Sequence, residues 1–159
     1  MIKKTFLLLT LFASVYLVGC AATVPMASLE EDSARKQFKK PTKGMGGIYI
    51  YRDSTLGFAL TKAVFVDDVM LGETAAQTYF YKEVKPGSHK LSTESEFSNN
   101  DLVINVQKGR NYFVNQFIKL GLFVGGADLQ LVSDTAGMSG VTQCRLAKET
   151  GPLKAASNY

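Results

Sequence analysis

Hydrophobic and polar positions alternate along most of the chain after residue 47. In the segment 48–52, IYIYR, isoleucines fall on one face and tyrosines on the other, and in 101–107, DLVINVQ, apolar residues recur at every second position. This period is typical of strands with one buried face. Strands are predicted over 48–52, 62–67, 69–73, 79–84, 88–94, 101–107, 111–118, 129–132 and 141–146.

The segment before the strands has a helical pattern instead. Ser28 is suited to cap a helix whose first turn is acidic, apolar residues follow at helical spacing, and basic residues precede Pro41. Negative charge at the start and positive charge at the end both suit the helix dipole. We predict a helix from Leu29 to Lys39.

Turn residues between the strands indicate the fold class. Gly, Pro and Asp interrupt the alternating runs at short intervals, and long helices do not alternate with strands. These features favour a mainly β fold, an antiparallel β-sandwich of about eight strands with one short N-terminal helix. The apolar, glycine-rich segment 121–127, GLFVGGA, is predicted to be a loop near the sheet, since it is too short to span a bilayer.

The first residues follow neither pattern. Lys3 and Lys4 precede an uncharged segment, 5–18, that is rich in Phe and Leu. As a helix this segment reaches only about 21 Å, less than the roughly 30 Å of a bilayer's hydrocarbon core. A basic start, an apolar stretch and then small residues are typical of a secretory signal, so residues 1–19 are predicted to be a cleaved signal peptide.

The end of that segment, LVGC at 17–20, resembles the bacterial lipobox at every position. The resemblance implies cleavage before Cys20 and acylation of Cys20, and two or more acyl chains hold a protein stably on a membrane. The next residue is Ala21 rather than aspartate, which favours the outer membrane, facing the periplasm, in a Gram-negative host. Cleavage within 22–24 is the weaker alternative.

The mature chain is predicted to have three parts: a lipidated tether over 20–27, a helix and β-sandwich domain over 28–147, and a loose tail over 148–159. Without Lys3 and Lys4 the formal charge falls from +4 to about +2, and no nucleic-acid partner is expected because that would need a clustered basic face. Cys144 is then the remaining cysteine, so no intramolecular disulfide is available, and we expect it to be buried and inert.

Ionisable residues concentrate in the segment 64–91, VFVDDVMLGETAAQTYFYKEVKPGSHKL. Asp67 and Asp68 lie between two apolar runs, and aspartate tolerates the positive φ that a tight hairpin needs, so a turn is predicted there. A metal site that adds Glu73 is the alternative. It is disfavoured because the apolar residues 69–71 stand where further oxygen ligands would be needed.

His89 is the one histidine of the chain, and it opens a strand after the turn residues 86–88. A zinc site would need more ligands, and Ser88 lies on the opposite face of the strand from His89, so neither a metal site nor a nucleophile and base pair is predicted. No catalytic residue is assigned, and no cofactor is expected beyond the lipid. An envelope hydrolase that uses His89 with an acidic partner is the alternative function.

The same stretch resembles the motif of PEGA-type and related transthyretin-like β-sandwich modules, which are non-enzymatic extracytoplasmic domains. The matching residues are Val66, Asp67, Gly72, Thr74, Pro86, Gly87 and His89. Asp68 departs from the motif, which has glycine there. With LVGC, IYIYR and VTQCRLA, the chain is similar to a family of small bacterial envelope lipoproteins known as a domain of unknown function. The resemblance implies no catalytic residues.

The expected function is therefore non-enzymatic binding or scaffolding at the membrane surface, with an envelope protein or peptidoglycan as candidate partner. The candidate binding face consists of Tyr49, Tyr51, Arg52, Tyr79 and Tyr81. Exposed aromatic side chains are common in such interfaces. The alternative is that these tyrosines pack under the helix or the second sheet. A free sheet edge that adds a peptide strand is another form of the binding hypothesis.

Overall fold

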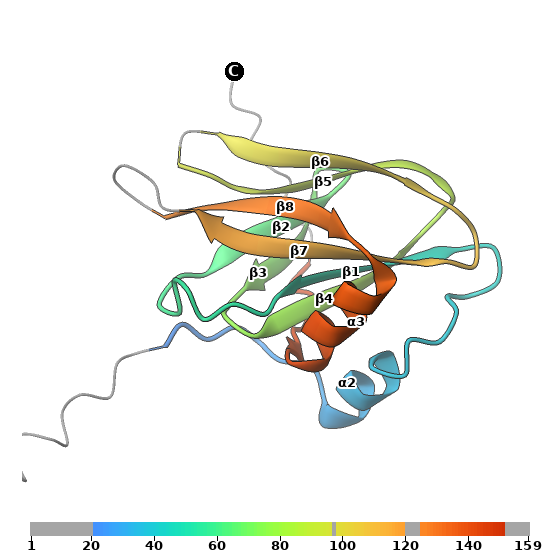
Figure 1. Ribbon diagram of the computed structural model, residues 1–159, viewed down its shortest axis with the longest axis horizontal. Coiled ribbons are helices and arrows are strands. Elements are labelled where there is room, and N and C mark those ends of the chain that lie inside the picture. Colours follow the sequence, from blue (N-terminus) through green and yellow to red (C-terminus); the bar gives the residue numbers. More distant parts are fainter. Residues whose placement is uncertain (1–20, 97, 120–124, 152–159) are drawn as a thin grey trace, which may run out of the picture.

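The computed structural model describes residues 21–96, 98–119 and 125–151. These residues form nine strands in two sheets, and two helices (Figure 1). The five-stranded sheet has the order β8 (Gly126–Val132), β7 (Asn111–Lys119), β1 (Gly46–Arg52), β4 (Thr78–Val84) and β9 (Arg145–Leu146). The four-stranded sheet has the order β3 (Val69–Thr74), β2 (Lys62–Val66), β5 (Gly87–Glu94) and β6 (Asn99–Val106).

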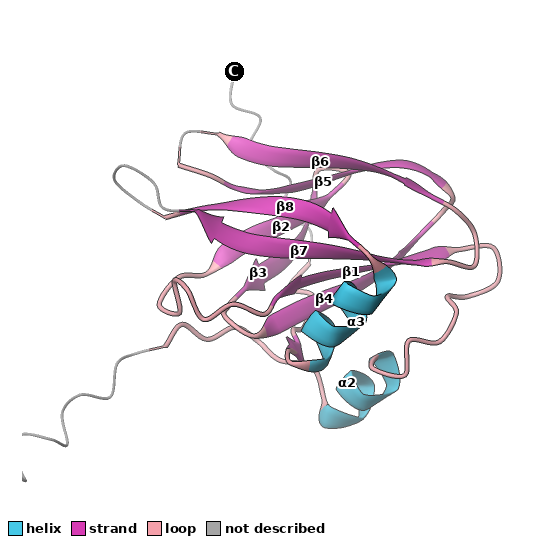
Figure 2. Cartoon of the chain, in the orientation of Figure 1, coloured by secondary structure: helices cyan, strands magenta, loops and turns pink. Residues whose placement is uncertain are grey.

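Strand β1 is buried on both of its faces. Ile48 and Ile50 belong to the core between the two sheets. Tyr49 and Tyr51 point the other way and pack beneath α2 (Leu29–Arg35) and α3 (Asp134–Thr142), the two helices drawn in cyan in Figure 2. The domain therefore has a second apolar layer outside the sandwich core.

The mainly β fold is confirmed, and the first eight predicted strands are present with boundaries shifted by a few residues. Five of the seven strand pairings among the described residues are antiparallel, but β1 pairs with β7 and β4 with β9 in parallel. Parallel neighbours need a long crossover connection, and the whole four-stranded sheet lies between β1 and β7 in the chain. Local alternation carries no signal of this pairing.

The last predicted strand, 141–146, is wrong for most of its length. Ser133 caps α3, which continues to Thr142. Only Arg145–Leu146 pair with β4, as β9. The chain therefore uses this region mainly to cover the five-stranded sheet, not to extend it.

Two glycines let α3 pack closely against the five-stranded sheet. A Cβ on Gly137 would collide with the ring of Phe113, and one on Gly140 with the ring of Tyr51. Glycine has low helix propensity, but it lets the helix backbone lie directly against these rings. Packing thus overrides local preference.

The predicted N-terminal helix is confirmed but shorter. The Ser28 side chain accepts a hydrogen bond from the Glu31 N–H, and the Glu31 carboxylate accepts one from the Ser28 N–H, which together make a capping box. The helix α2 ends at Arg35 rather than Lys39. Phe38 has a left-handed backbone (φ 50°), which ends the helical path and places its ring against Tyr49.

The turn predicted at Asp67 and Asp68 is confirmed. Both residues have positive φ, 51° and 62°, and they join β2 to β3. Two successive left-handed residues are the geometry of a type I′ hairpin, whose twist matches that of the flanking strands.

Both segments that flank the domain, the predicted tether and the start of the predicted loose tail, are hydrogen bonded to it. Ala27 N–H donates to the Leu146 carbonyl (3.0 Å), and Lys148 N–H donates to the Pro25 carbonyl (2.8 Å). Thr150 N–H is hydrogen bonded to β3. The two segments hold each other against the edge of the domain.

Several predictions concern residues that the structure does not describe. The signal peptide over 1–19, the lipidation residue Cys20 and the tail over 152–159 lie outside the described residues, as does most of the predicted loop over 121–127. The described end of that loop, Gly126 and Ala127, opens β8. No helix in the described part of the chain is long and apolar enough to cross a membrane.

Candidate functional site

The five residues predicted to form a binding face are buried. None of Tyr49, Tyr51, Arg52, Tyr79 and Tyr81 has more than 8% of its surface exposed. The prediction of an exposed face is therefore wrong, and the alternative, packing under a helix, is correct. Alternation indicates that the two faces of a strand differ, but it does not indicate that both are covered.

Tyr49 is the centre of this aromatic layer. Its ring stacks on Phe113 with centroids 5.1 Å apart and contacts Tyr81 at 4.6 Å. Its hydroxyl donates to the Arg35 carbonyl at the end of α2 (2.8 Å). Burial raises the pKa of Tyr49 to about 12, so the hydroxyl stays protonated and fastens α2 to the sheet.

Arg52 ends β1 and is fully buried, yet no carboxylate in the described ranges forms an ion pair with it. Its guanidinium donates instead to the carbonyls of Leu60 (2.8 Å), Leu56 (3.0 Å) and Gly57 (2.5 Å). Burial lowers the pKa of Arg52, but an arginine starts so high that it stays charged. The cation fixes the shape of residues 53–61, between β1 and β2, which we call the Arg52 loop.

The Arg52 loop presents two large apolar side chains to solvent. Leu56 is 52% exposed and Phe58 is 51% exposed. The Phe58 carbonyl accepts a hydrogen bond from the Ala22 N–H (3.0 Å), so the loop also contacts the N-terminal segment. A buried charge that holds an exposed apolar loop in shape makes this loop a candidate interaction surface.

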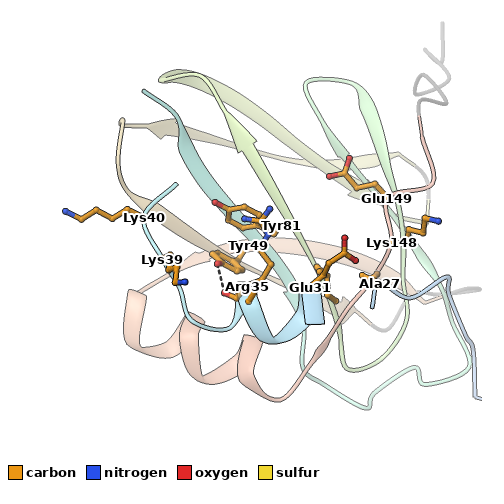
Figure 3. A pocket seen from close by; sticks show the side chains of 12 residues that line it. Ala27, Glu31, Arg35, Lys39, Lys40, Tyr49, Tyr81, Lys148 and Glu149 are labelled. Atoms are coloured by element: carbon orange, nitrogen blue, oxygen red, sulfur yellow. Dashed lines mark hydrogen bonds between the residues drawn. The ribbon is translucent and has the colours of Figure 1, made fainter. Parts of the chain in front are cut away.

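A pocket of about 500 Å³ opens beside α2, and Figure 3 shows its lining. Arg35 lies over the ring of Tyr81, 4.2 Å from the ring centroid. Lys39 and Lys40 lie on one side of the pocket, and Lys148 lies on the other. Cationic residues therefore lie on two sides of an aromatic floor.

The two acidic residues that line this pocket are already engaged. Glu31 completes the capping box with Ser28, and Glu149 pairs with Lys82 (2.7 Å). The lining therefore carries an excess of positive charge. Arginine and lysine side chains in such a setting bind carboxylate or phosphate groups.

Asp32 links two segments that contribute to the pocket lining, α2 and the chain at Leu146. Its Oδ1 accepts the Leu146 N–H (2.9 Å), and its Oδ2 accepts from Lys36 Nζ (3.0 Å). Burial by itself raises the pKa of Asp32, but these hydrogen bonds bring it below its ordinary value. One charged carboxylate thus joins α2 to β9.

The structure brings His89 together with an acidic residue, Asp67. His89 Nδ1 lies 2.6 Å from Asp67 Oδ2, and Nε2 lies 2.7 Å from the Lys85 carbonyl oxygen. Burial alone lowers the pKa of His89, but the hydrogen bonds to Asp67 and Lys85 outweigh it and raise the pKa. Both partners are acceptors, so both ring nitrogens donate, which favours the charged imidazolium. The ring joins the β2–β3 hairpin turn to the connection between β4 and β5, and it has no free nitrogen to accept a proton.

The structure also bears on a cysteine nucleophile and on metal binding. Cys144 is buried as predicted, and burial raises its pKa to about 12. No group of three His, Cys, Asp or Glu side chains in the described part of the chain is placed to hold a metal ion. Sequence reasoning missed the pocket and Asp32, because the lining comes from distant segments and Asp32 has the pattern of an ordinary acidic first turn.

These features define a two-sheet β domain with two covering helices, a cationic pocket and an apolar loop. The chain belongs to the family described as "Protein of unknown function (DUF2846)", whose model matches residues 42–127. That range contains the Arg52 loop and His89, while α2 precedes it. The predicted membership in a domain-of-unknown-function family is confirmed.

The chain is similar to an "Uncharacterized protein" of Haemophilus influenzae, with 47% identity over 146 residues. The match covers 92% of this chain and 87% of that protein, so α2 and the Arg52 loop fall within a similarity of nearly full length. No solved structure matches.

Proposed function

We propose that the protein is a lipid-anchored, non-enzymatic binding module of the bacterial envelope. The observation that carries the proposal is the N-terminal order of a basic start, an uncharged segment and the lipobox-like LVGC that ends at Cys20. Acyl chains on Cys20 would hold the domain on a membrane. Ala21 favours the outer membrane, facing the periplasm, in a Gram-negative host. The resemblance to PEGA-type modules supports a role without catalysis.

The pocket beside α2 is the proposed ligand site. Lys39, Lys40 and Lys148 surround it, and its two carboxylates are occupied elsewhere. An acidic group is the ligand that this charge favours, and the peptides of peptidoglycan carry carboxylates. Peptidoglycan is therefore the proposed partner, and an acidic envelope protein is the other outcome of the test below.

The state of the reactive side chains supports a role in binding. His89 has both ring nitrogens in hydrogen bonds, so it cannot act as a base without losing a contact. The Cys144 thiol is buried with a raised pKa, which disfavours a nucleophilic thiolate.

Metabolic labelling with palmitate tests the anchor. The wild-type chain should incorporate label in bacterial cells, and Cys20→Ala should lose it because the acyl acceptor is gone. Label that persists in Cys20→Ala would refute acylation at this residue.

Sedimentation with purified peptidoglycan tests the pocket. The variant Lys39→Glu with Lys40→Glu reverses charge on one side of the pocket, and it should lose most of the co-sedimentation. Lys108→Glu with Arg110→Glu, in the exposed turn after β6, reverses the same number of charges as the matched control and should co-sediment like wild type. Equal retention of all three proteins would contradict the assignment, and crosslinking in intact cells would then identify a protein partner.

The contact between His89 and Asp67 is the observation that favours the alternative, an envelope hydrolase. Substitution of His89 by alanine separates the two functions. Binding to peptidoglycan should be unchanged in His89→Ala. Loss of a measurable hydrolytic activity with an unchanged circular dichroism spectrum would support the hydrolase.

A further inference from the structure

We infer that the Arg52 loop rests on the membrane and fixes the orientation of the domain there. This inference rests on the proposed acylation of Cys20. It adds a lipid-contacting surface to an anchor that would otherwise determine only where the protein is held.

The chain is fixed to the domain almost immediately after Cys20. Ala22 N–H donates to the Phe58 carbonyl (3.0 Å), and Val24 packs against the core between the sheets. The Pro25 carbonyl then accepts the Lys148 N–H (2.8 Å). No flexible linker follows Ala22.

The short distance to the lipid limits how far the loop can lie from the membrane. Two residues of extended chain, from Cys20 to Ala22, reach at most about 7 Å, which is close to the roughly 5–8 Å thickness of one headgroup layer. The acyl chains on Cys20 lie in the hydrocarbon core. Ala22, and the loop that is hydrogen bonded to it, must therefore lie in or next to the headgroup layer.

The side chains of the loop suit this position. Leu56 and Phe58 are both half exposed and lie two positions apart on the loop that contacts Ala22. Apolar side chains at the boundary of headgroups and acyl chains remove their surface from water. Because Arg52 already holds the loop carbonyls, little conformational entropy is lost on contact. We therefore assign the lipid surface as the partner of these side chains, because the anchor at Cys20 holds the loop next to it.

This orientation leaves the pocket open to the aqueous phase. The Asn111 side-chain amide donates to the Lys39 carbonyl (3.1 Å), and Asn111 pairs with Gly47 at the start of β1. From Gly47 to Arg52 the strand advances about 16 Å. The loop at one end of β1 contacts lipid, whereas Lys39 and Lys40 lie near the other end of the strand, away from the loop.

Tryptophan fluorescence tests the inference, because the chain contains no tryptophan. Full-length acylated Phe58→Trp is placed in vesicles of phosphatidylethanolamine and phosphatidylglycerol in which part of the lipid carries bromine on its acyl chains. The F58W emission should shift to shorter wavelength and lose most of its intensity to quenching. Leu56→Trp is a second probe, which keeps the test valid if Phe58→Trp does not fold.

Val103→Trp is the matched control. Val103 is 64% exposed and pairs with Lys90. The Lys90 N–H donates to Asp67, in the turn after β2, whereas the Arg52 loop precedes β2. Val103 therefore lies near the opposite end of β2 from the Arg52 loop. The V103W emission should not be quenched. The inference is overturned if F58W and L56W are both unquenched, or if V103W is quenched as strongly.

Palmitate labelling of the same samples separates the two proposals. A labelled protein with an unquenched loop overturns the membrane contact and leaves the anchor intact. A protein without label overturns the anchor, and the contact with it.

Discussion

Strands β1 and β6 have the same alternation in sequence and different environments in the fold. All seven residues of β1 are buried, whereas the residues of β6 alternate between exposed and buried or half-buried. Both strands turn one face to the core between the sheets. The other face of β1 lies under α2 and α3, and that of β6 lies in solvent. Alternation therefore indicates that one face of a strand is buried in the core. Whether the other face is also buried depends on segments that are distant in the sequence.

The residues on the second face reflect this difference. In β1 they are Tyr49 and Tyr51, and tyrosine combines an apolar ring with a hydroxyl that needs a partner when buried. The Tyr49 hydroxyl finds one in α2. In β6 the corresponding residues include Asp101 and Asn105, which are exposed. Side chains on the covered face contribute to stability through packing, and side chains on the open face contribute little. Substitutions on the covered face should therefore lower the free energy of unfolding more than substitutions on the open face.

The largest expected difference is between Phe113→Ala and Val103→Ala. Phe113 is fully buried against Tyr49, so its truncation should lower the free energy of unfolding by about 3–5 kcal/mol. Val103 lies on the open face, and its truncation should change that free energy by less than about 0.5 kcal/mol. Urea unfolding measures both values. Similar values for the two variants would contradict the distinction between the sheets.

A smaller difference is expected between the two arginines that follow or end these strands. Arg52→Met removes a charged donor from three loop carbonyls and should cost about 2 kcal/mol. Amide hydrogen exchange should also quicken in residues 53–61. Arg110→Met, in the exposed turn after β6, should change the free energy of unfolding by less than about 0.5 kcal/mol. An unchanged exchange rate in Arg52→Met would show that the loop does not depend on this cation.

Two substitutions to alanine in α3, two positions apart, should change the stability of the domain in opposite directions. Gly137→Ala should destabilise by about 1–2 kcal/mol, because the added Cβ meets the Phe113 ring, although alanine favours a helix. Ser139→Ala, on the exposed side of α3, should be neutral or stabilise by up to about 0.5 kcal/mol. Thermal unfolding measures both. Stabilisation by Gly137→Ala would mean that α3 does not lie so close to the sheet.

The smallest effect concerns His89 on the open sheet. The pKa of His89 is raised above the ordinary value of 6.5, so its contact with Asp67 contributes fully below pH 6.5 and is lost as the pH rises through the folded pKa. His89→Gln should remove this dependence of the free energy of unfolding on pH. Asp67→Asn keeps the bond from His89 to the Lys85 carbonyl, so it should weaken this dependence, and asparagine tolerates the positive φ there. A profile like that of wild type in either variant would exclude the contact as its cause.

Local signals in the sequence were sufficient for most of the fold. The strand positions follow from alternation, the helix start from the cap residue Ser28 and the acidic turn after it, and the hairpin turn from the pair Asp67 and Asp68. Each of these depends on residues close together in the chain. The helix α3 could not be predicted in this way, because Gly137 and Gly140 disfavour a helix and are explained only by the rings beneath them.

The candidate sites were much less accessible from sequence. Arg52 was predicted to lie on an exposed binding face, but it is buried and its partners are main-chain carbonyls, which have no signature in sequence. The pocket combines α2 with Lys148, which the fold brings together from near the two ends of the described chain. Such sites depend on tertiary contacts that no local pattern encodes.

The bridge between Met26 and Ala147 also has a consequence for how the chain folds. It pairs a residue near the first described position with one near the last, so the contact cannot form until nearly the whole domain is available. Contacts of such long sequence separation form slowly, since a large loop must close first. The segment that follows Cys20 should therefore be among the last parts of the domain to become protected when the chain folds.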